Sequence, residues 1–501
     1  MLFIWNNFAL RSCSALVIAC LASMGFAQNE DDALRVSTNA PGGTARSIGL
    51  ANAFGALGAD GSMISINPAG FGLFRTSEFS MTPAFEVNDV KSLYYGTSAS
   101  ATKSRFYIGN MVLAFNSPSE RGSDWRSSTF GIAYDRTATH HWSRQAIGDR
   151  VGSSILDGFA SQATGTLPDS LYNALPFTSG LAYDAFGINP NDTLGTSYSA
   201  ALPFGADVRQ LHTIESRGAN NTTSFFYSAN WMDQLYIGLS LGIVGHRFTR
   251  TTTHTENTLD ETIDLQDLTY KENLTTTGNG IDVKAGVIWR WSDRFRTGVA
   301  FHSPQWTQLN DAYTTSVQSN FRRIPASADR LGFLYTSPDG IFNYRVQTPW
   351  RTVLSAAYIA GGHGLMSVDY EYVDYANSRF KPSNKLVDPY DFAYENEVIR
   401  DRFRAVHSVR VGTEWRSGSW YFRLGWGFVP DAFKKSDPRH AQAQRTYAGG
   451  VGYRSEHLGI DLGMNYVQGS TNYYQYDPAL VSATNETRTT VRSLVTVSLR
   501  P

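Results

Sequence analysis

The sequence predicts an all-β protein, a 14-stranded antiparallel transmembrane β-barrel with an N-terminal hatch in its lumen. Three observations predict this fold class. Aromatic residues and glycine are abundant although the chain is not hydrophobic on average. Many segments alternate apolar and polar residues, which is the strand period. The links between these segments are alternately short and long, as in barrels of bacterial outer membranes.

The composition fits strands that have one face in lipid and one in water. Of 501 residues, 13% are aromatic and 17% are charged, and the mean hydropathy is −0.28. Beyond residue 27 no apolar run reaches the roughly 18 residues that a membrane helix needs. Only a closed barrel then satisfies the backbone in lipid. The net charge of −1 argues against a nucleic-acid partner.

Residues 1–27 are predicted to be a cleaved signal peptide. Arg11 precedes an apolar run over 15–22, and the small residue Ala27 stands just before the expected cut. The alternative is a lipoprotein site at Cys20, but the apolar stretch before it is too short. The expected location is the outer membrane of a Gram-negative-type envelope.

Both cysteines, Cys13 and Cys20, lie inside the predicted signal peptide. The mature chain is therefore expected to have no thiol and no disulfide. We also expect no cofactor.

Residues 28–75 are predicted to form the hatch, a plug in the lumen. They are rich in Gly, Ala, Asn and Ser and contain the short apolar pieces 48–51 and 63–66. Because this segment precedes the first strand, we expect it to start on the inner side. The alternative is a floppy periplasmic linker, but a disordered segment is poorer in apolar residues and richer in charge.

The barrel is predicted over residues 76–501. In Met366–Tyr372 and Leu458–Met464, for example, every second residue is apolar. The fourteen predicted strands are 77–87, 104–116, 126–138, 212–231, 234–254, 268–292, 294–318, 340–360, 363–380, 403–416, 419–430, 445–454, 457–468 and 488–500.

The links sort by length. Those after even-numbered strands are short, such as Ser417-Gly418, and those after odd-numbered strands are long. The longest, residues 139–211, is predicted to be an external loop with helix-like pieces at 143–159 and 171–186. Tryptophans beside the short turns, such as Trp415, are expected to form an interfacial girdle.

Candidate catalytic and metal-binding residues are few. Asp369 and Glu371 share a strand face, and lumen walls commonly carry such charges as structural ion pairs. His140 and His141 are weak candidates for haem capture, because no third ligand stands at a suitable spacing. We predict that the chain is not an enzyme.

Several passages resemble the FadL/TodX family of outer-membrane transport proteins. The sequence Asn67-Pro68-Ala69-Gly70-Phe71 follows a small-residue stretch at 42–49 and precedes the first predicted strand. Thr348–Arg351, Val368–Tyr375 and Val409–Trp415 are also similar to the family. Within this family, the sequence most resembles Bacteroidetes-like members, some of which are labelled hemin receptors. The last strand departs from the usual pattern, because it ends in Leu499-Arg500-Pro501 rather than in an aromatic residue.

This resemblance implies a monomeric barrel, assembled in the bilayer by the barrel-assembly machinery. It implies passive uptake of hydrophobic small molecules such as long-chain fatty acids, which leave through an opening in the barrel wall. Asn67, Pro68, Ala69 and Phe71 would then be the hatch residues that control passage. Two alternatives remain: a PorV-like protein-secretion shuttle and a haem-binding outer-membrane receptor.

Overall fold

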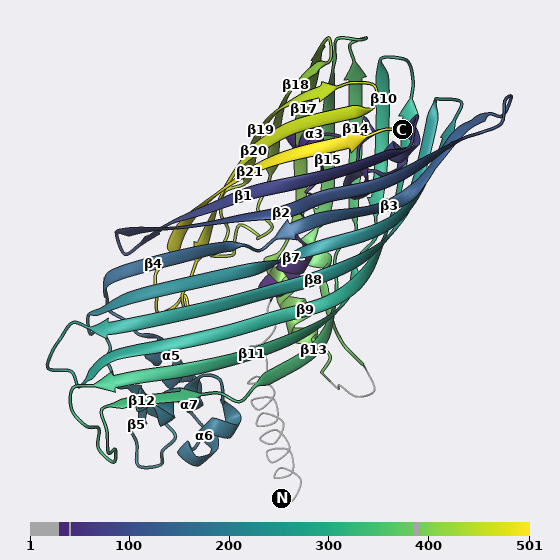
Figure 1. Cartoon of the computed structure of the whole chain (residues 1–501). Helices are drawn as coiled ribbons and strands as arrows, with labels where there is room; N and C mark the ends of the chain where they lie inside the picture. Colours follow the sequence, from purple (N-terminus) through teal and green to yellow (C-terminus); the bar gives the residue numbers. More distant parts are fainter. Residues whose placement is uncertain (1–29, 40–41, 385–389) are drawn as a thin grey trace, which may run out of the picture.

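The computed structural model describes residues 30–39, 42–384 and 390–501, so the predicted signal peptide lies outside the described residues. One antiparallel sheet closes on itself as a barrel (Figure 1). The first strand, β1 (Glu78–Tyr94), pairs on one side with β2 (Thr97–Pro118) and on the other with β21 (Thr484–Leu499). The predicted closure of the last strand onto the first is confirmed.

The sheet has nineteen strand segments, which combine into fourteen barrel strands because four of the fourteen are interrupted. The remaining segments are β3 (Trp125–Thr139), β4 (Trp142–Val151), β7 (Val208–Trp231), β8 (Leu235–Thr258), β9 (Leu265–Arg290), β10 (Phe295–His302), β11 (Trp306–Phe321), β12 (Gly332–Thr336), β13 (Gly340–Gln347), β14 (Arg351–Ile359), β15 (Gly364–Asp374), β16 (Arg379–Pro382), β17 (Ala405–Ser417), β18 (Trp420–Val429), β19 (Gln444–Arg454) and β20 (Leu458–Tyr473).

The interruptions have local causes. Pro304 separates β10 from β11 and Pro349 separates β13 from β14. Proline lacks a backbone N–H, so it cannot continue a ladder of hydrogen bonds. The short 3-10 helix η2 (Tyr375–Asn377) separates β15 from β16.

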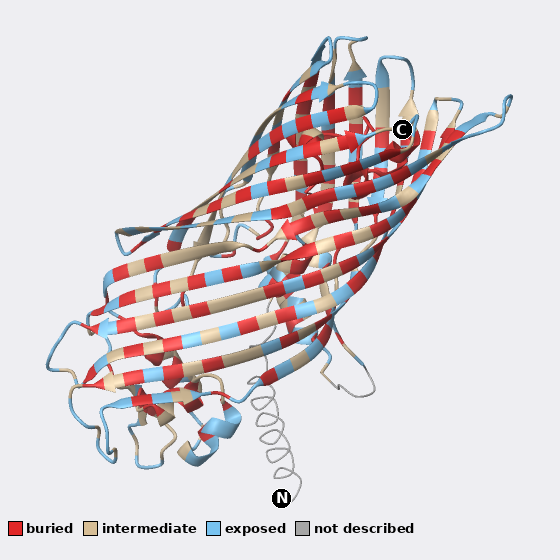
Figure 2. Ribbon diagram, viewed as in Figure 1, coloured by how far each residue is buried: buried red, intermediate tan, exposed pale blue. Residues whose placement is uncertain are grey.

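Burial alternates along the strands, as the red and blue bands of Figure 2 show. On β8, the exposed outward side chains are first apolar, from Ile237 to Ile243. The outward side chains then become polar, with the exposed Arg247 followed by the partly exposed Thr249 and Thr251. The apolar stretch is the lipid-facing band, and the polar stretch lies beyond it. The long strands β7, β8 and β9 therefore continue well past the membrane.

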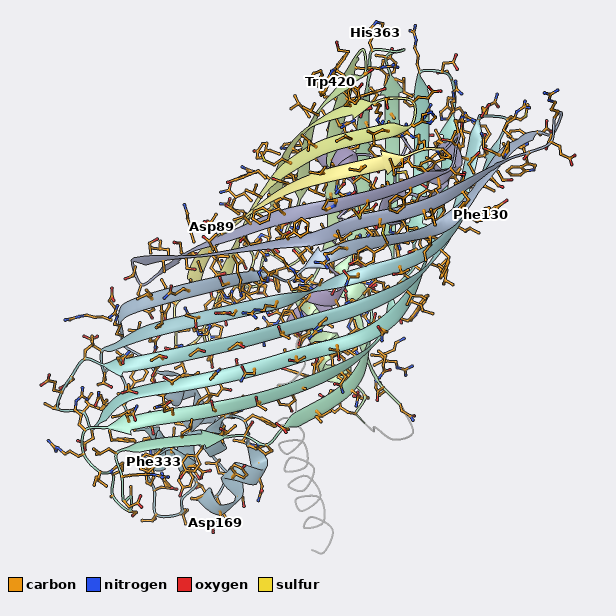
Figure 3. The ribbon with its side chains drawn as sticks, viewed as in Figure 1. Asp89, Phe130, Asp169, Phe333, His363 and Trp420 are labelled. Atoms are coloured by element: carbon orange, nitrogen blue, oxygen red, sulfur yellow. The ribbon has the colours of Figure 1, made fainter. Side chains whose placement is uncertain are left out.

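The two ends of the barrel differ as predicted. Trp420 and His363, at the short turns, lie at one end of the molecule, and Asp169 and Phe333, in or beside the long links, lie at the other (Figure 3). We call these the inner and outer ends. The predicted strand bounds leave a long first link over 88–103, and this prediction is wrong. Both strands run on to a two-residue turn at Tyr95-Gly96, whose φ angles of 44° and 81° suit a tight hairpin.

The predicted external loop 139–211 is partly wrong. Residues 142–151 form β4, which pairs with β7, because their side chains alternate between two faces. Helices begin only at α5 (Ile155–Ala163), followed by α6 (Pro168–Ala174), α7 (Ser179–Asp184) and the hairpin of β5 (Ile188–Pro190) and β6 (Tyr198–Ala200). Apolar residues of these helices cluster with Leu268, Tyr270 and Val317 of β9 and β11, so the helices pack against the outer part of the barrel.

The N-terminal segment lies in the lumen. It contains α2 (Glu30–Ser37), α3 (Ala45–Gly49), α4 (Met63–Ile66) and the 3-10 helix η1 (Pro68–Leu73). In the outer loops, α8 (Ala393–Arg402) contacts α2. Among the described residues, no helix has the length and apolar character to cross a bilayer. The expectation that the segment starts on the inner side is wrong for Glu30, which binds an outer loop. The segment runs through the lumen toward the inner end.

Candidate functional site

Residues 42–74, which we call the docked segment, rest on glycines of the barrel wall. A Cβ on Gly463 of β20 would lie 2.2 Å from the carbonyl oxygen of Ala45, and one on Gly425 of β18 would lie 2.4 Å from the nitrogen of Ala51. These distances are far below van der Waals contact, so no side chain fits between wall and segment. Glycine here allows the close approach of two backbones.

The same pattern recurs on a second sector of the wall. A Cβ on Gly286 of β9 would lie 1.9 Å from Asn67 Oδ1, and one on Gly238 of β8 would lie 2.4 Å from the nitrogen of Ala69. The docked segment is thus seated on β17–β20 at one side and on β8–β10 at the other.

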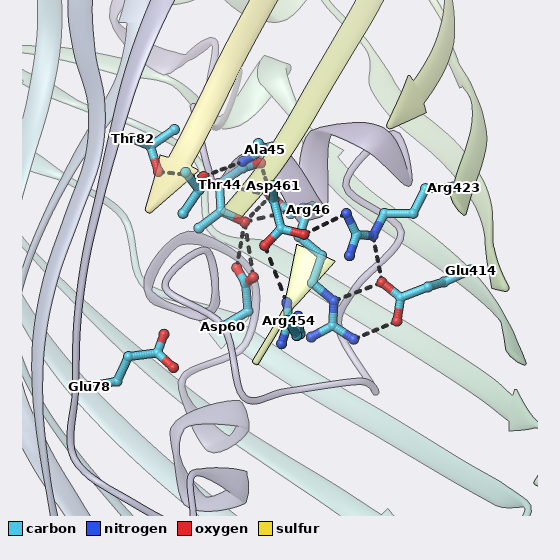
Figure 4. Close-up of polar contacts among 12 residues, drawn as sticks. Thr44, Ala45, Arg46, Asp60, Glu78, Thr82, Glu414, Arg423, Arg454 and Asp461 are labelled. Carbon is cyan, nitrogen blue, oxygen red and sulfur yellow. Dashed lines mark hydrogen bonds and ion pairs between the residues drawn. The ribbon is translucent and has the colours of Figure 1, made fainter. Parts of the chain in front are cut away.

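Buried charges reinforce the first seat (Figure 4). Arg46 of α3 donates to both carboxylate oxygens of Glu414, at 2.9 and 2.8 Å. Glu414 also accepts from Arg423 at 2.5 Å, and Arg423 contacts Asp461 at 2.7 Å. All four side chains are almost fully buried, so each charge depends on its partner. The network ties α3 to three wall strands.

Two wall carboxylates hold the backbone of the docked segment. Asp369 of β15 accepts from the backbone nitrogens of Phe54 and Gly55, both at 2.9 Å. Asp135 of β3 accepts from the nitrogen of Gly43 at 3.1 Å and from the hydroxyl of Ser65. Bonds to a carboxylate are stronger than neutral ones. Asp369 is therefore a positioning residue of this segment, whereas the structural ion pair expected from the sequence is made by its neighbour Glu371 with Arg410.

The predicted hatch residues lie together at the second seat. Asn67 donates to the carbonyl oxygens of Gly55 (2.8 Å) and Val287 (3.3 Å) and accepts from the nitrogen of Ala69 (3.1 Å). Pro68 begins η1, where a missing N–H costs nothing. Phe71 is fully buried and stacks on Phe226 of β7, with ring centroids 3.8 Å apart.

The first described residues are held differently. In α2, Glu30 and Asp31 form ion pairs with Arg439 at 2.7 and 3.0 Å, and Glu30 also contacts Arg402. Arg439 belongs to the outer loop between β18 and β19. Burial alone would raise the pKa of its other partner, Asp437, but the Arg439 hydrogen bonds hold that pKa below its ordinary value. These side chains are partly exposed, and such pairs are individually weak.

The apolar side of α2 completes a cluster of aromatic residues. Ala33 and Val36 pack among side chains of β11, β13, β16 and the outer loops. The rings include Tyr344 and Phe380, with centroids 5.7 Å apart, and Phe392, which stacks on Phe380 at 5.6 Å. Helix α2 thus fills an apolar site in the outer half of the lumen.

A small polar pocket adjoins this cluster through Val36, at the level of the strand interruptions. Its lining includes Arg351, Lys284 and His302 together with residues 36–39. Lys284 is paired with Asp282 at 3.0 Å, whereas Nη1 of Arg351 is buried without a hydrogen-bond partner. The free volume is about 20 Å³, which is room for one water molecule.

The wall has a seam in its outer half. Strand β2 pairs with β3 only from Asn110 to Pro118, and β4 pairs with β7. Between β2 and β4 no ladder forms in the described chain. Side chains bridge the seam instead: Thr97 donates to Asp149 of β4 at 3.0 Å, and Lys103 reaches past β4 to Glu215 of β7 at 3.3 Å.

The two histidines proposed for haem lie at this seam but do not converge. His140 Nε2 contacts Asn220 Oδ1 at 3.1 Å and its ring meets Phe248 edge-on. His141 Nε2 contacts the carbonyl oxygen of Ser104 at 3.2 Å. Within the described ranges, no group of three His, Cys, Asp or Glu side chains is placed to hold a metal ion. Haem capture by His140 and His141 stays a prediction.

Sequence reasoning missed the glycine seats, Arg351 and Arg439. An available signal was that Gly412, Gly425 and Gly463 occupy inward-facing positions of clearly alternating strands. Arg351 had been noted only within a family-like passage, and Arg439 stands in a loop without periodicity.

In its fold the chain is similar to solved outer-membrane proteins. A FadL homologue of Pseudomonas aeruginosa has a TM-score of 0.54 at 12% identity, over 92% of this chain and 98% of that one. The toluene transporter TodX of Pseudomonas putida has a TM-score of 0.51 at 12% identity, over 90% of this chain and 98% of that one. No family model and no curated protein sequence matches the chain.

The closed barrel and its lipid-facing band define an outer-membrane β-barrel. Within that class, the chain has the fold of the FadL-type transporters, as the sequence resemblance implied. The similarity to Bacteroidetes-like members and the hemin-receptor label stay predictions.

Proposed function

We propose that this protein mediates passive uptake of hydrophobic small molecules with an anionic head, such as long-chain fatty acids, across the outer membrane. The observation that carries the proposal is the juxtaposition of the aromatic cluster around Phe380 with the buried, unpaired guanidinium nitrogen of Arg351. An apolar chamber beside a cation suits an acyl chain ending in a carboxylate.

In the proposed cycle, α2 occupies the ligand site in the resting state. A ligand displaces α2 and residues 36–39, and its carboxylate pairs with Arg351. The docked segment stays seated and blocks the axial path. The ligand then leaves sideways through the seam between β2 and β4, where only side chains must separate. The FadL-type fold supports this proposal, and the solved TodX is a toluene transporter.

Uptake into proteoliposomes tests the proposal. We expect intact protein to admit labelled palmitate faster than empty liposomes do. Arg351→Gln should slow palmitate about tenfold or more, because a hydrogen bond to a charged group is worth about 1.5–3 kcal/mol. The same variant should leave uptake of methyl palmitate nearly unchanged.

Arg345→Gln is the matched control, because Arg345 is an exposed arginine on the adjacent β13. Palmitate uptake by intact protein at the rate of empty liposomes would refute the transport proposal. Equal slowing of palmitate and methyl palmitate would refute the role of Arg351 as the carboxylate partner.

A further inference from the structure

The lipid-facing wall carries a groove that faces away from the lumen and borders the seam where β2 is unpaired with β3. It crosses β19, β20, β21, β1 and β2 and has a volume of about 510 Å³. Its exposed apolar side chains include Phe106, Met464 and Leu462, with exposed fractions of 68%, 55% and 54%. Pockets for small molecules have volumes of about 300–1,000 Å³, so the groove is large enough for a lipid chain.

The groove follows from one register row of the sheet. Gly449 pairs with Met464, Met464 with Ser493, Ser493 with Phe85, and Phe85 with Phe106. Gly449 has no side chain and Ser493 a short one, so the larger side chains of the row stand around a hollow. A Cβ on Gly449 would meet no atom closer than 3.6 Å. Unlike Gly463, Gly449 does not contact the docked segment. The missing side chain at Gly449 instead leaves space on the outer face of the barrel.

The polar boundary lies above this row. Two residues toward the outer end, the row contains Tyr447 and Tyr466, and two further on it contains Arg445. Four residues span about 13 Å along a strand. At a strand tilt of about 45°, this length is a rise of about 9 Å within an apolar band of about 25 Å. The groove therefore lies within the apolar band, and Arg445 lies about 9 Å nearer to the outer surface of the membrane.

On the outer side of the groove, most of the charged side chains that flank it are cationic. Arg445 of β19 and Lys91 of β1 are both exposed on the outer face. The carboxylate of Asp89, on the Arg445 row, accepts a hydrogen bond from Thr102 at 2.7 Å. Cations at the membrane surface attract anionic lipid headgroups.

We propose that this groove is a binding site for an anionic lipid of the surrounding outer leaflet. One acyl chain lies in the hollow between Met464 and Phe85, and the headgroup phosphate pairs with Arg445 and Lys91. Because the site faces lipid and not the lumen, this inference does not depend on the proposed transport function.

Native mass spectrometry of the purified protein in detergent micelles tests the site, with dipalmitoyl phosphatidylglycerol and dipalmitoyl phosphatidylcholine as probes. The intact protein should retain phosphatidylglycerol in preference. Gly449→Leu should fill the groove and lower this retention about tenfold, which corresponds to about 1.4 kcal/mol. Replacing both Arg445 and Lys91 by Gln should remove the preference between the two lipids.

Gly245→Leu is the matched control, because Gly245 is an outward-facing glycine of β8 with open space around it. Ser493→Leu fills the same groove from β21 and decides the matter if Gly449→Leu does not fold. Retention of phosphatidylglycerol by both groove-filling variants at the level of intact protein would overturn the proposal. So would loss of retention in Gly245→Leu to the same extent.

Discussion

The docked segment and helix α2 are consecutive in sequence and share the lumen, yet they are held by different means. The docked segment sits on wall glycines with no space between and is tied by nearly buried charges. Helix α2 is held by partly exposed ion pairs to Arg439 and Arg402 of the outer loops. The contacts of the docked segment resist displacement, whereas those of α2 permit it. We therefore expect α2 to move when a ligand binds.

The largest expected effect is on the buried charge network. Glu414→Leu removes the ion-pair partner of the buried Arg46 and leaves Arg423 with Asp461 alone. Breaking a buried pair costs about 3–5 kcal/mol. Urea unfolding in detergent micelles should show a loss of this size. A matched control is Arg416→Leu on the same strand, where the side chain is exposed. Equal stability of Glu414→Leu and the intact protein would show that α3 is not anchored by charge.

A somewhat smaller effect is expected at the glycine seat. Gly463→Ala places a methyl group against the carbonyl oxygen of Ala45. Overpacking of this kind costs about 1–3 kcal/mol. The docked segment should also be pushed from the wall, so ion conductance in planar bilayers should rise. Gly449→Ala, on the neighbouring strand and facing outward, should change neither quantity. Unchanged conductance and stability in Gly463→Ala would contradict the seat.

Asn67→Ala tests the predicted hatch motif. It removes the hydrogen bonds to Gly55, Val287 and Ala69, each worth about 1 kcal/mol when not replaced by water. We expect a loss of about 1–2 kcal/mol in the free energy of unfolding and faster amide hydrogen exchange at η1. If exchange at Gly70 and Phe71 stays as slow as in the intact protein, Asn67 does not hold this turn.

The smallest effect on global stability is expected at Arg439. Arg439 is partly exposed and its buried partner Asp437 keeps its ion pair with Arg402, so Arg439→Ala should lower the free energy of unfolding by only about 1 kcal/mol. Helix α2 should nevertheless loosen. With Thr38→Cys as the only thiol, maleimide labelling should become about tenfold faster in the Arg439→Ala background. With Ser62→Cys, in the docked segment, the rate should not change. Equal acceleration at both sites would remove the distinction between the two regions.

Much of the barrel could be read from the sequence, because a strand carries its burial pattern in every second residue. The alternation at Leu458–Met464 is local, and so is the short turn at Ser417-Gly418. Apolar pieces such as Met63–Ile66 led to the prediction of a hatch, and in the structure these residues are buried. The sequence did not predict that this segment starts at the outer end. An even number of strands places the start of the first strand, at Glu78, on the inner side, but it does not determine the path of the residues before Glu78.

The contacts of the candidate site could not be read in the same way. The backbones of Ala45 and Gly463 are in contact although the two residues are hundreds of positions apart in the sequence. Neither alanine nor glycine has a side chain that would indicate a specific contact partner. The importance of Arg351 depends on which neighbours leave its Nη1 unpaired, which only the folded arrangement determines.

The length of the wall strands has a consequence for where ligands are met. Strand β9 has 26 residues, and at about 3.3 Å per residue and a tilt of about 45° it rises roughly 60 Å. The hydrocarbon layer accounts for only about 25 Å of that height. The outer end of the barrel therefore extends tens of ångströms beyond the hydrocarbon layer. A molecule arriving from the medium encounters protein well before it reaches the bilayer surface.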